Sequence, residues 1–544
     1  MKIIPFRSVL AAACAVSLLI AGGPAARAKT FELETASIAD IQAAVDAGAL
    51  TYEKLVTLCL ARIQAYNESG PALHALITLN PKALDEARAR DAEFKATGRR
   101  SPLFGIPILP KDNYDTADLP TTGGSFLLDG SLPPQDSTMI KKLRDAGVII
   151  LGKTNLNEFA SGGPGTPSGF SSLGGQTHNP HDPAHGPGGS SGGTGASIAA
   201  WFAPLGLGTD TGGSIRNPCS FNGIVGIKPT NGLLSRAGII PLSLSFDTGG
   251  PMARSVYDVA LALGFMTGLD SRDPLTSTQM GLAYTDYTQF LRKDALKGAR
   301  IGVNRNYVGK DAEVDQILDR TVAELRAAGA VVIDPVNYPE YVIDAKAGIM
   351  NAVRYTEFRE QIRVYLSTLK PGYPKDLSEM IAKADALTEP TGRYAPNWGR
   401  FDAFKLENAG PPPTALAYRA AKEYGMPMVR AAVLGVFEEN KLDAIIYTTN
   451  PAPAPLIVPP FKAPPGTPAG NPGSLTNVAN ITNFPDVIVP AGVTREKLPV
   501  TISFFGTAYS EPRLLAYAYA YEQATHHRVT PSTTPALPGE KFDY

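Results

Sequence analysis

The chain has 544 residues, of which 44% are hydrophobic and 19% charged, and its formal net charge is −1. That hydrophobic share is typical of a globular protein and excludes a disordered one. The near-neutral charge gives no electrostatic basis for binding nucleic acid, so we expect no nucleic-acid partner. The 53 Gly and 47 Pro predict many turns and exposed loops, where functional residues often lie.

Residues 1–28 resemble a secretory signal peptide. Lys2 and Arg7 give a positive start, an apolar run follows to about Ala21, and small residues precede a cleavage position after Ala28. The alternative, a membrane anchor, is weaker because the apolar run is too short to cross ~30 Å of hydrocarbon. We therefore expect export, with a mature protein, residues 29–544, that is periplasmic or secreted and does not associate with the membrane.

The mature chain is expected to begin with helices, over residues 29–95. Ser37 is suited to cap a first helix that ends near Gly48, and Thr51 to cap a second. Only Cys59 and Cys219 remain after cleavage of the signal, so no disulfide framework is available and stability must come from the core.

From residue 100 onward, short apolar runs alternate with helical patterns. The runs predicted as strands are 148–151, 300–303, 331–333, 487–489 and 500–504. This alternation favours an α/β fold with a partly parallel sheet. No linker divides the chain.

Two segments look like insertions over this core. Residues 340–430 have a mostly helical pattern, and residues 451–473 are dense in Pro and Gly. The second segment is either a plain surface loop or one wall of a substrate pocket.

The most informative stretch runs from Gly188 to Gly232. A Gly-rich loop before a Ser lets backbone N–H groups converge, as a tetrahedral oxyanion requires. Such a loop also cradles phosphates in some proteins, but the Gly-Lys-Ser/Thr ending of that pattern is absent here. Gly188-x-Ser190-x-Gly192 formally fits a nucleophile elbow, which would have to follow a buried strand. The preceding residues are polar and rich in Pro, so they do not form such a strand and the elbow is disfavoured.

A serine nucleophile needs a base, and two kinds are available. The histidines His178, His181 and His185 cluster in an irregular loop, where solvated side chains are more plausible than metal ligands. Lys111 ends the apolar run 105–110, and a desolvated lysine loses its proton readily enough to act as a base.

These segments together closely resemble the amidase signature family of serine hydrolases. The stretch from Gly188 to Gly232 is similar to the family signature, and residues 105–113 to its catalytic-lysine segment. Similar motifs recur at residues 152–160, at 247–254 and near the C-terminus, so that the resemblance covers about residues 37–525. It implies a single large mixed β-sheet covered by helices on both faces. The spacing and residues 509–512 are most similar to bacterial peptide amidases, which release ammonia from C-terminally amidated peptides.

The resemblance assigns roles to residues of this chain. It implies Ser214 as the acylated nucleophile, Ser190 as a bridging serine on a cis peptide bond and Lys111 as the base. No metal and no organic cofactor are implied. The oxyanion or substrate-binding residues would be Thr211, Gly212 and Gly213, and the residues that could line the substrate are Ala160 and Asn217. Asp210 and Arg216 are expected to form a charge pair that braces the loop, with direct substrate contact as the alternative.

Other interpretations remain open at this point. Aryl or fatty acyl amides are alternative substrates for the same triad. A non-catalytic binding protein on this scaffold, or the amidase component of a tRNA amidotransferase, would be a different class of function. The expected partner is a small-molecule or peptide amide, and nothing in the sequence sets the oligomeric state.

Overall fold

The computed structural model describes residues 29–464 and 476–544. The predicted signal peptide lies outside the described residues. Both expected N-terminal helices are confirmed, as α1 (Ile38–Asp46) and α2 (Tyr52–Tyr66). The Ser37 hydroxyl accepts the N–H of Asp40, and the Thr51 hydroxyl accepts that of Lys54, so each predicted cap satisfies a backbone donor of the first turn. A third helix, α3 (Ala83–Thr97), packs on α2.

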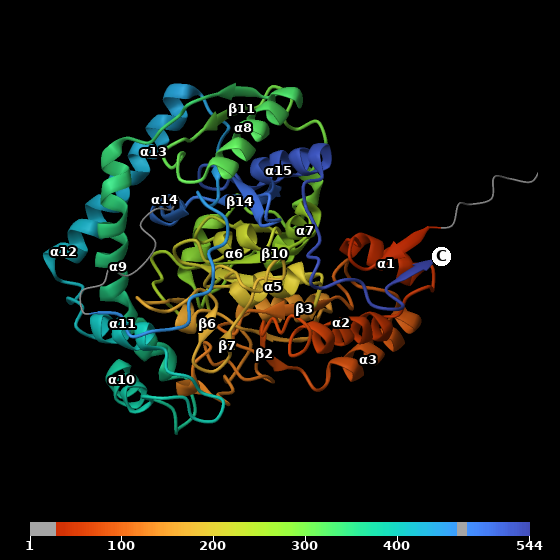
Figure 1. Ribbon diagram of the computed structural model, residues 1–544, viewed down its shortest axis with the longest axis horizontal. Helices are drawn as coiled ribbons and strands as arrows, with labels where there is room; N and C mark the ends of the chain where they lie inside the picture. The colour runs from red at the N-terminus through yellow and green to blue at the C-terminus, as the bar shows by residue number, and fades with distance from the viewer. Residues whose placement is uncertain (1–28, 465–475) are drawn as a thin grey trace, which may run out of the picture.

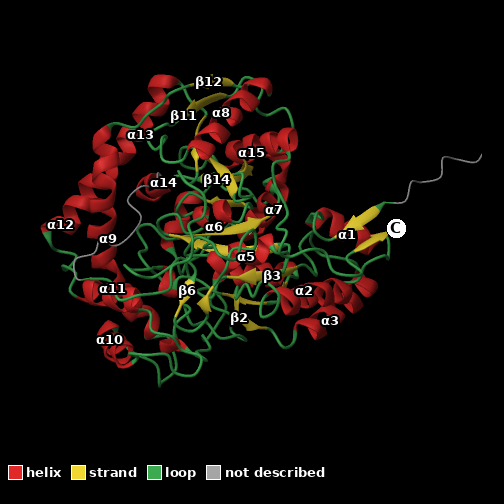
Figure 2. Ribbon diagram, in the orientation of Figure 1, coloured by secondary structure: helices red, strands yellow, loops and turns green. Residues whose placement is uncertain are grey.

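One mixed sheet of ten strands forms the centre of the molecule (Figures 1 and 2). Its strands lie in the order β12 (Val331–Ile333), β11 (Arg300–Val303), β13 (Ala444–Thr448), β15 (Pro499–Phe505), β14 (Asp486–Val493), β9 (Val225–Lys228), β10 (Thr248–Ala253), β8 (Leu205–Asp210), β3 (Pro107–Pro110) and β4 (Ile149–Ile150). Neighbours are parallel among the first three strands and among the last three, and antiparallel in between. This confirms the α/β fold with a large mixed sheet.

Glycines in the central strands let one layer of helices lie directly on the sheet. Gly206 and Gly208 of β8 share one face, because side chains alternate along a strand. A Cβ on Gly206 would lie 2.6 Å from the Thr194 side chain of α5 (Gly192–Ala199), and one on Gly208 would lie 2.9 Å from the Ser191 hydroxyl. These glycines therefore place the serine loop and α5 against the sheet.

Helices cover both faces. On the face of α5 lies α6 (Arg216–Phe221). Gly249 of β10 points the other way, where the position of its Cβ lies 2.5 Å from Met139 of α4. The helices of that second face are α4 (Thr138–Ala146), α7 (Val256–Met266), α8 (Ala312–Ala327) and α15 (Glu511–Thr525).

The expected helical insertion forms an arm along one side of the sheet, coloured teal in Figure 1. It consists of α9 (Glu340–Leu366), α10 (Leu377–Ala386), α11 (Trp398–Asn408), α12 (Leu416–Arg419), a π-helical turn (Ala420–Gly425) and α13 (Met426–Asn440). After β13 the chain enters the Pro-rich segment, which the structure describes up to residue 464. Residues 465–473 of the predicted segment lie outside the described residues, and the next described element is α14 (Thr476–Thr482). Within the ranges that the structure describes, no helix is both long and apolar enough to span a bilayer.

Three two-stranded ribbons complete the fold. They pair β1 (Thr30–Glu32) with β16 (Lys541–Asp543), β2 (Leu76–Leu79) with β5 (Gly152–Thr154), and β6 (Phe170–Ser171) with β7 (Gly175–Gln176). The first ribbon joins the beginning of the described chain to its end.

Candidate active site

Lys111 follows directly after β3, which lies between β8 and β4 in the sheet. Its side chain is fully buried, and Nζ lies 2.7 Å from the Ser190 hydroxyl and 2.8 Å from the Thr209 hydroxyl. Burial lowers the pKa of Lys111 to about 7, although the nearby carboxylates Asp210 and Asp247 act to raise it. The sequence-predicted lysine and the bridging serine are therefore in direct contact.

The neighbouring carboxylate of Asp112 has partners other than Lys111. Asp112 Oδ1 lies 3.2 Å from Nζ of Lys153, and its other oxygen accepts the Thr122 N–H at 3.1 Å. Asp112 therefore forms an ion pair with a second buried lysine instead of holding the proton on Lys111.

Ser190 lies on a loop that is held from both sides. The Gly189–Ser190 peptide bond is cis, and the Ser190 carbonyl accepts the N–H of Asn157 at 3.0 Å. The next residue, Ser191, donates its N–H to the Ser214 carbonyl at 3.1 Å, and its hydroxyl accepts the Thr209 N–H at 3.2 Å. Ser191 thus has a local hydrogen-bonding role, and it joins the Ser190 loop to the Ser214 loop.

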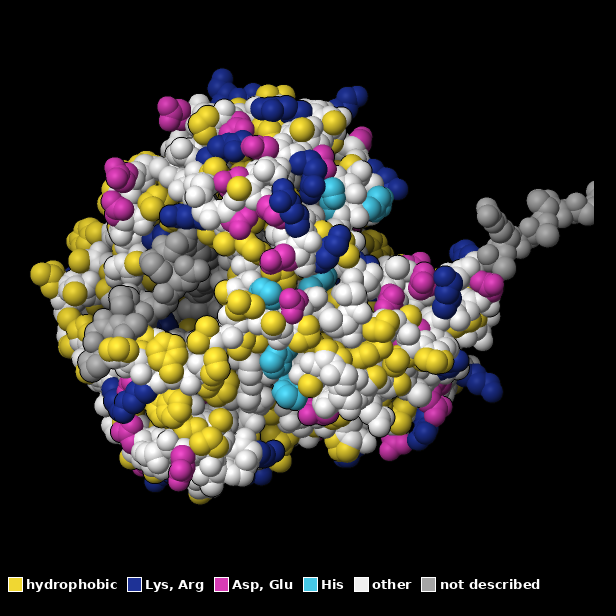
Figure 3. Space-filling view, in the orientation of Figure 1, with side chains coloured by type: hydrophobic (Ala, Val, Ile, Leu, Met, Phe, Trp, Pro, Cys, Tyr) yellow, Lys and Arg dark blue, Asp and Glu magenta, His cyan; other side chains and the backbone are white. Residues whose placement is uncertain are grey.

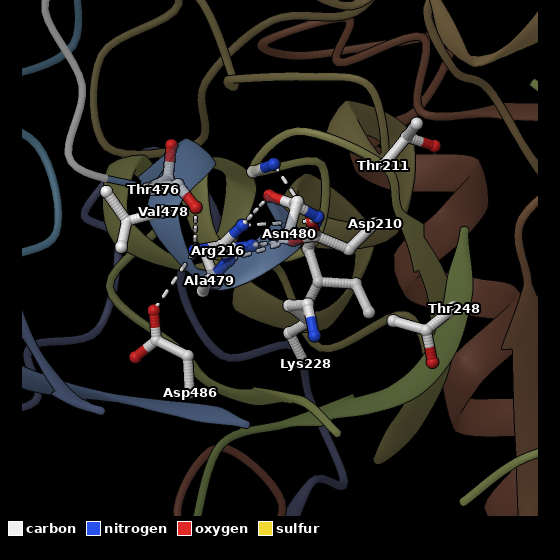
Figure 4. Close-up of polar contacts among 12 residues, drawn as sticks. Asp210, Thr211, Arg216, Lys228, Thr248, Thr476, Val478, Ala479, Asn480 and Asp486 are labelled. Carbon is white, nitrogen blue, oxygen red and sulfur yellow. Dashed lines mark hydrogen bonds and ion pairs between the residues drawn. The ribbon is translucent and has the colours of Figure 1, made fainter. Parts of the chain in front are cut away.

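The Ser214 loop is braced by a buried ion pair (Figure 4). Asp210 accepts two hydrogen bonds from Arg216, each 3.1 Å long, and Arg216 also lies 3.1 Å from Asp486. All three side chains are fully buried. Burial alone would raise the pKa of Asp210, but the Arg216 guanidinium and further hydrogen bonds hold it well below its usual range. The predicted pair is therefore present and has a bracing position.

The backbone around Ser214 presents several N–H groups. Asp210 already accepts the N–H of Gly213 at 2.9 Å and that of Ile215 at 3.0 Å. Across the described part of the chain, no hydrogen bond occupies the N–H of Gly212 or of Ser214. An oxyanion at this loop would therefore find two open donors, whereas Gly213 would have to share its donor with Asp210.

Thr211 is fixed by its side chain. Its hydroxyl donates to Asp247 Oδ1 at 2.5 Å, and the other oxygen of Asp247 accepts the N–H groups of Leu242 and Ser243. A Cβ on the adjacent Gly212 would lie 3.5 Å from Met350 of α9. The helical arm therefore reaches the loop that carries the nucleophile candidate.

The two substrate-lining candidates lie at different places. Ala160 borders a small, largely apolar cavity together with Thr209, Thr211 and Asp247. Asn217 is half-buried beside the loop glycines, and the position of a Cβ on Gly213 lies 3.0 Å from its amide nitrogen. Ala160 thus shares a cavity with Thr209, a contact of Lys111, and Asn217 lies beside Gly213 of the Ser214 loop.

The histidine cluster faces backbone groups and one nearby carboxylate. His178 Nδ1 lies 2.6 Å from the Pro183 carbonyl, and His181 Nε2 lies 3.2 Å from that of Asn222. Among the residues described, no group of three or more His, Cys, Asp or Glu side chains is arranged to hold a metal ion. The loop before Ser190 also contains no strand after β7, which ends at Gln176, so Ser190 does not lie on a nucleophile elbow.

Several site residues were not assigned from sequence. Thr209 contacts the lysine, Asn157 holds the cis-peptide loop, and Asp247, Asn480 and Asp486 secure the Ser214 loop. Thr209 and Asp247 lie within the motifs at 188–232 and 247–254 that resemble the family, so the sequence did contain a signal for these two residues. Asn480 and Asp486 come from more than 200 residues away and have no local signature.

Comparisons with known proteins show the family of the chain. Residues 54–515 match the family model described as Amidase. The solved native peptide amidase from Stenotrophomonas maltophilia is 38% identical, with a TM-score of 0.83 and coverage of 92% of this chain and 99% of that one.

Two further relatives extend over similar lengths. A probable amidase of Arabidopsis thaliana is 34% identical over 511 residues, which are 92% of each chain. A glutamyl-tRNA(Gln) amidotransferase component from Thermoanaerobacter pseudethanolicus is 34% identical over 86% of this chain and 93% of the relative. Because the family model spans most of the chain and the relatives match nearly end to end, the chain belongs to the amidase signature family and is an amide-hydrolysing enzyme.

Proposed function

We propose that this amidase hydrolyses C-terminal amides of peptides, or related small amides, through an acyl-enzyme on Ser214. The hydrogen bond between Lys111 and Ser190 carries the proposal, because it joins a buried amine whose pKa is about 7 to a serine whose neighbour, Ser191, is bonded to the Ser214 carbonyl. The 38% identity to a peptide amidase favours peptide amides over aryl or fatty acyl amides.

Lys111 suits the role of base better than two other buried lysines of the described residues, Lys153 and Lys228. Lys153 donates to the Tyr114 carbonyl and contacts Asp112, while Lys228 donates to the carbonyls of Pro229 and Phe484. These contacts direct both of those ammonium groups to carbonyl and carboxylate oxygens. A neutral Lys111, by contrast, is placed to accept the Ser190 proton directly.

The reaction follows in two halves. As the Ser214 oxygen attacks the amide carbon, its proton passes to Ser190 and the Ser190 proton passes to Lys111. When the tetrahedral species collapses, the carbon–nitrogen bond breaks and Lys111 returns a proton through Ser190 to the leaving nitrogen, which departs as ammonia or an amine. Water then attacks the ester by the same route and releases the carboxylic acid and free Ser214.

The developing oxyanion needs fixed donors that already point to one place. The open N–H groups of Gly212 and Ser214 supply two of them in this proposal. Thr211, held by Asp247, keeps the turn in place, and Gly213 contributes only by sharing its N–H with Asp210.

The experiment is to label the purified enzyme with a fluorophosphonate and to map the adduct by mass spectrometry. We expect one adduct, on Ser214, and none in the Ser214→Ala variant, whose fold should persist because little volume is removed. An adduct on Ser190 or elsewhere would refute the assignment. Hydrolysis rates on peptide, aryl and fatty amides decide between the substrate classes, and absence of both labelling and turnover would indicate a binding protein.

Export of the enzyme is a second part of the proposal. The predicted cleavage follows Ala28, and the backbone of the next residue, Lys29, pairs with Tyr544 at 2.7 Å in both directions. A cut at that position would leave this pairing intact. N-terminal sequencing of the active protein should begin at Lys29, and retention of Met1 would contradict export by this route.

A further inference from the structure

The Pro-rich segment, residues 451–464, runs along the loops that carry the catalytic serines. Figure 1 shows it as the blue trace that passes β6 towards α11. It contains six prolines at positions 451, 453, 455, 459, 460 and 464. Proline fixes one backbone angle and favours an extended chain, so the segment loses little conformational entropy when a ligand binds to it.

Backbone hydrogen bonds attach this segment to two loops of the site. The Pro455 carbonyl accepts the N–H of Gly186 at 2.8 Å, and Ile457 donates to the Ala184 carbonyl at 2.8 Å. Further along, Phe461 donates to the Gly165 carbonyl at 3.0 Å. These hydrogen bonds hold one side of the segment against the neighbouring loops.

Both loops lead to Ser190, the first along the chain and the second through Asn157. Gly186 precedes Ser190 by four residues. The loop containing Gly165 continues to Gly169, whose N–H donates to the Asn157 side chain at 2.8 Å, and Asn157 in turn donates its own N–H to the Ser190 carbonyl. The chain returns at Thr476, whose hydroxyl lies 2.8 Å from the position of a Cβ on Gly213. The Pro-rich segment therefore borders the catalytic loops.

The other side of the segment presents apolar side chains to solvent. Leu456, Val458 and Phe461 are 64%, 58% and 50% exposed. Leu456 and Val458 alternate with the less exposed Ile457, as residues of an extended chain do. Figure 3 shows hydrophobic side chains gathered on this face of the molecule. Among residues 451–464, Lys462 is the one charged side chain.

We propose that Leu456 and Val458 bind apolar residues that lie upstream of the scissile C-terminal amide in a peptide substrate. The inference rests on the proposed function and names the preferred substrate within it. The scissile amide has to reach Ser214, which is only 9% exposed, so the remaining peptide must leave across the surface that borders the catalytic loops. The Pro-rich segment offers that peptide a rigid, nearly uncharged and apolar surface.

The test compares three substrates: phenylalanine amide, Gly-Gly-Phe amide and Leu-Leu-Phe amide. The readout is the ratio of kcat/KM between the two tripeptide amides, so any general loss of activity in a variant cancels. We expect the wild type to prefer the leucine peptide about ten-fold, the scale that buried apolar groups give in substrate selection. The double variant Leu456→Ser/Val458→Ser should reduce the ratio to near one.

The matched control is Leu416→Ser, which removes an even more exposed leucine, at 82%, from α12 on the arm. It should keep the wild-type ratio. Two outcomes would overturn the inference: a double variant that keeps the preference for the leucine peptide, or a wild type that has no such preference. In both cases phenylalanine amide would still be hydrolysed. Failure of the proposed function looks different, because none of the three amides would then be hydrolysed.

Discussion

The catalytic loops and the outer turn of the helical arm, residues 416–425, hold their charged side chains in opposite ways. Asp210, Arg216 and Asp486 are fully buried, and each is joined to the others or to backbone groups within 3.1 Å. On the arm, Arg419 and Glu423 pair along one helical face but remain about half exposed. Buried charges must be satisfied together, whereas exposed pairs are easily replaced by water.

In our proposal, this difference separates the residues that fix the reaction from those that select the substrate. Substitutions at Asp210, Arg216 and Asp486 are expected to be costly, because each of these buried side chains also satisfies a buried partner. The arm and the Pro-rich segment also present exposed apolar side chains, as at Leu416, Tyr424 and Leu456. We expect changes at these exposed positions to alter substrate range more than the chemistry.

The largest effect is expected from removing the buried base. Lys111→Ala should lower kcat/KM on the order of 10⁴ or more, the scale for members of a catalytic unit. Lys111→Met is the matched control, since it keeps most of the volume but accepts no proton, and it should be as inactive. Activity in either variant within ten-fold of wild type would contradict the role of Lys111.

The pH dependence of the wild type tests the same residue. The pKa of Lys111 is lowered to about 7, and only the neutral amine accepts a proton, so activity should be lost as the pH falls through about 7. It should remain high on the alkaline side. The measurement is kcat/KM against pH on one small amide, which reports the free enzyme. If Lys111→Ala retained the same rise, another group would be titrating.

The bridging serine should have a smaller effect. Ser190→Ala interrupts the proton path but leaves the nucleophile and the open N–H groups in place. We expect a loss of about 10²–10⁴ in rate, the range for a lost acid–base group. Ser191→Ala is the comparison, because Ser191 has structural contacts only, and it should lower thermal stability more than Ser190→Ala does while retaining more activity. The reverse order would exchange the two roles.

How far the sequence predicts this molecule depends on how local the signal is. The strands Arg300–Val303 and Val331–Ile333 were predicted with the bounds that the structure has, because each is a short apolar run between helices. Helix α5, by contrast, begins at Gly192, inside the Gly-rich stretch. Glycine disfavours helices, yet a Cβ on Gly193 would lie 2.4 Å from the carbonyls of Ala75 and Asn155, so packing selects glycine there.

The candidate site divides in the same manner. Lys111, Ser190 and Ser214 could be proposed from sequence because they lie in recognisable segments. The distant partners of Arg216 could not, because only the fold brings Asn480 of α14 and Asp486 of β14 to it. A charge that must be buried predicts that partners exist, but the sequence pattern does not say where they are.

Arg216 tests the contrast between the two regions through stability. Arg216→Met leaves Asp210 and Asp486 buried without their cation, so the free energy of unfolding should fall by about 3–5 kcal/mol. Activity should fall as well, because Asp210 anchors the N–H groups of Gly213 and Ile215. Arg419→Met on the arm should leave the unfolding midpoint unchanged. Equal losses of unfolding free energy in Arg216→Met and Arg419→Met, measured by denaturant titration, would contradict the difference between the buried and the exposed ion pairs.

The smallest effect on activity is expected from treatment with a metal chelator. The histidines His178, His181 and His185 are the side chains that most resemble a metal site in sequence, and their ring nitrogens contact Pro183, Asn222 and Asp182. Burial lowers the pKa of His181 to about 4, so its ring is neutral at working pH and remains bonded to the Asn222 carbonyl. A metal ion would have to break these contacts to gain three ligands. Long dialysis against a strong chelator should therefore leave kcat/KM on a small amide unchanged, and so should His178→Ala. Loss of activity that returned with zinc would mean that the proton path through Lys111 is not the mechanism.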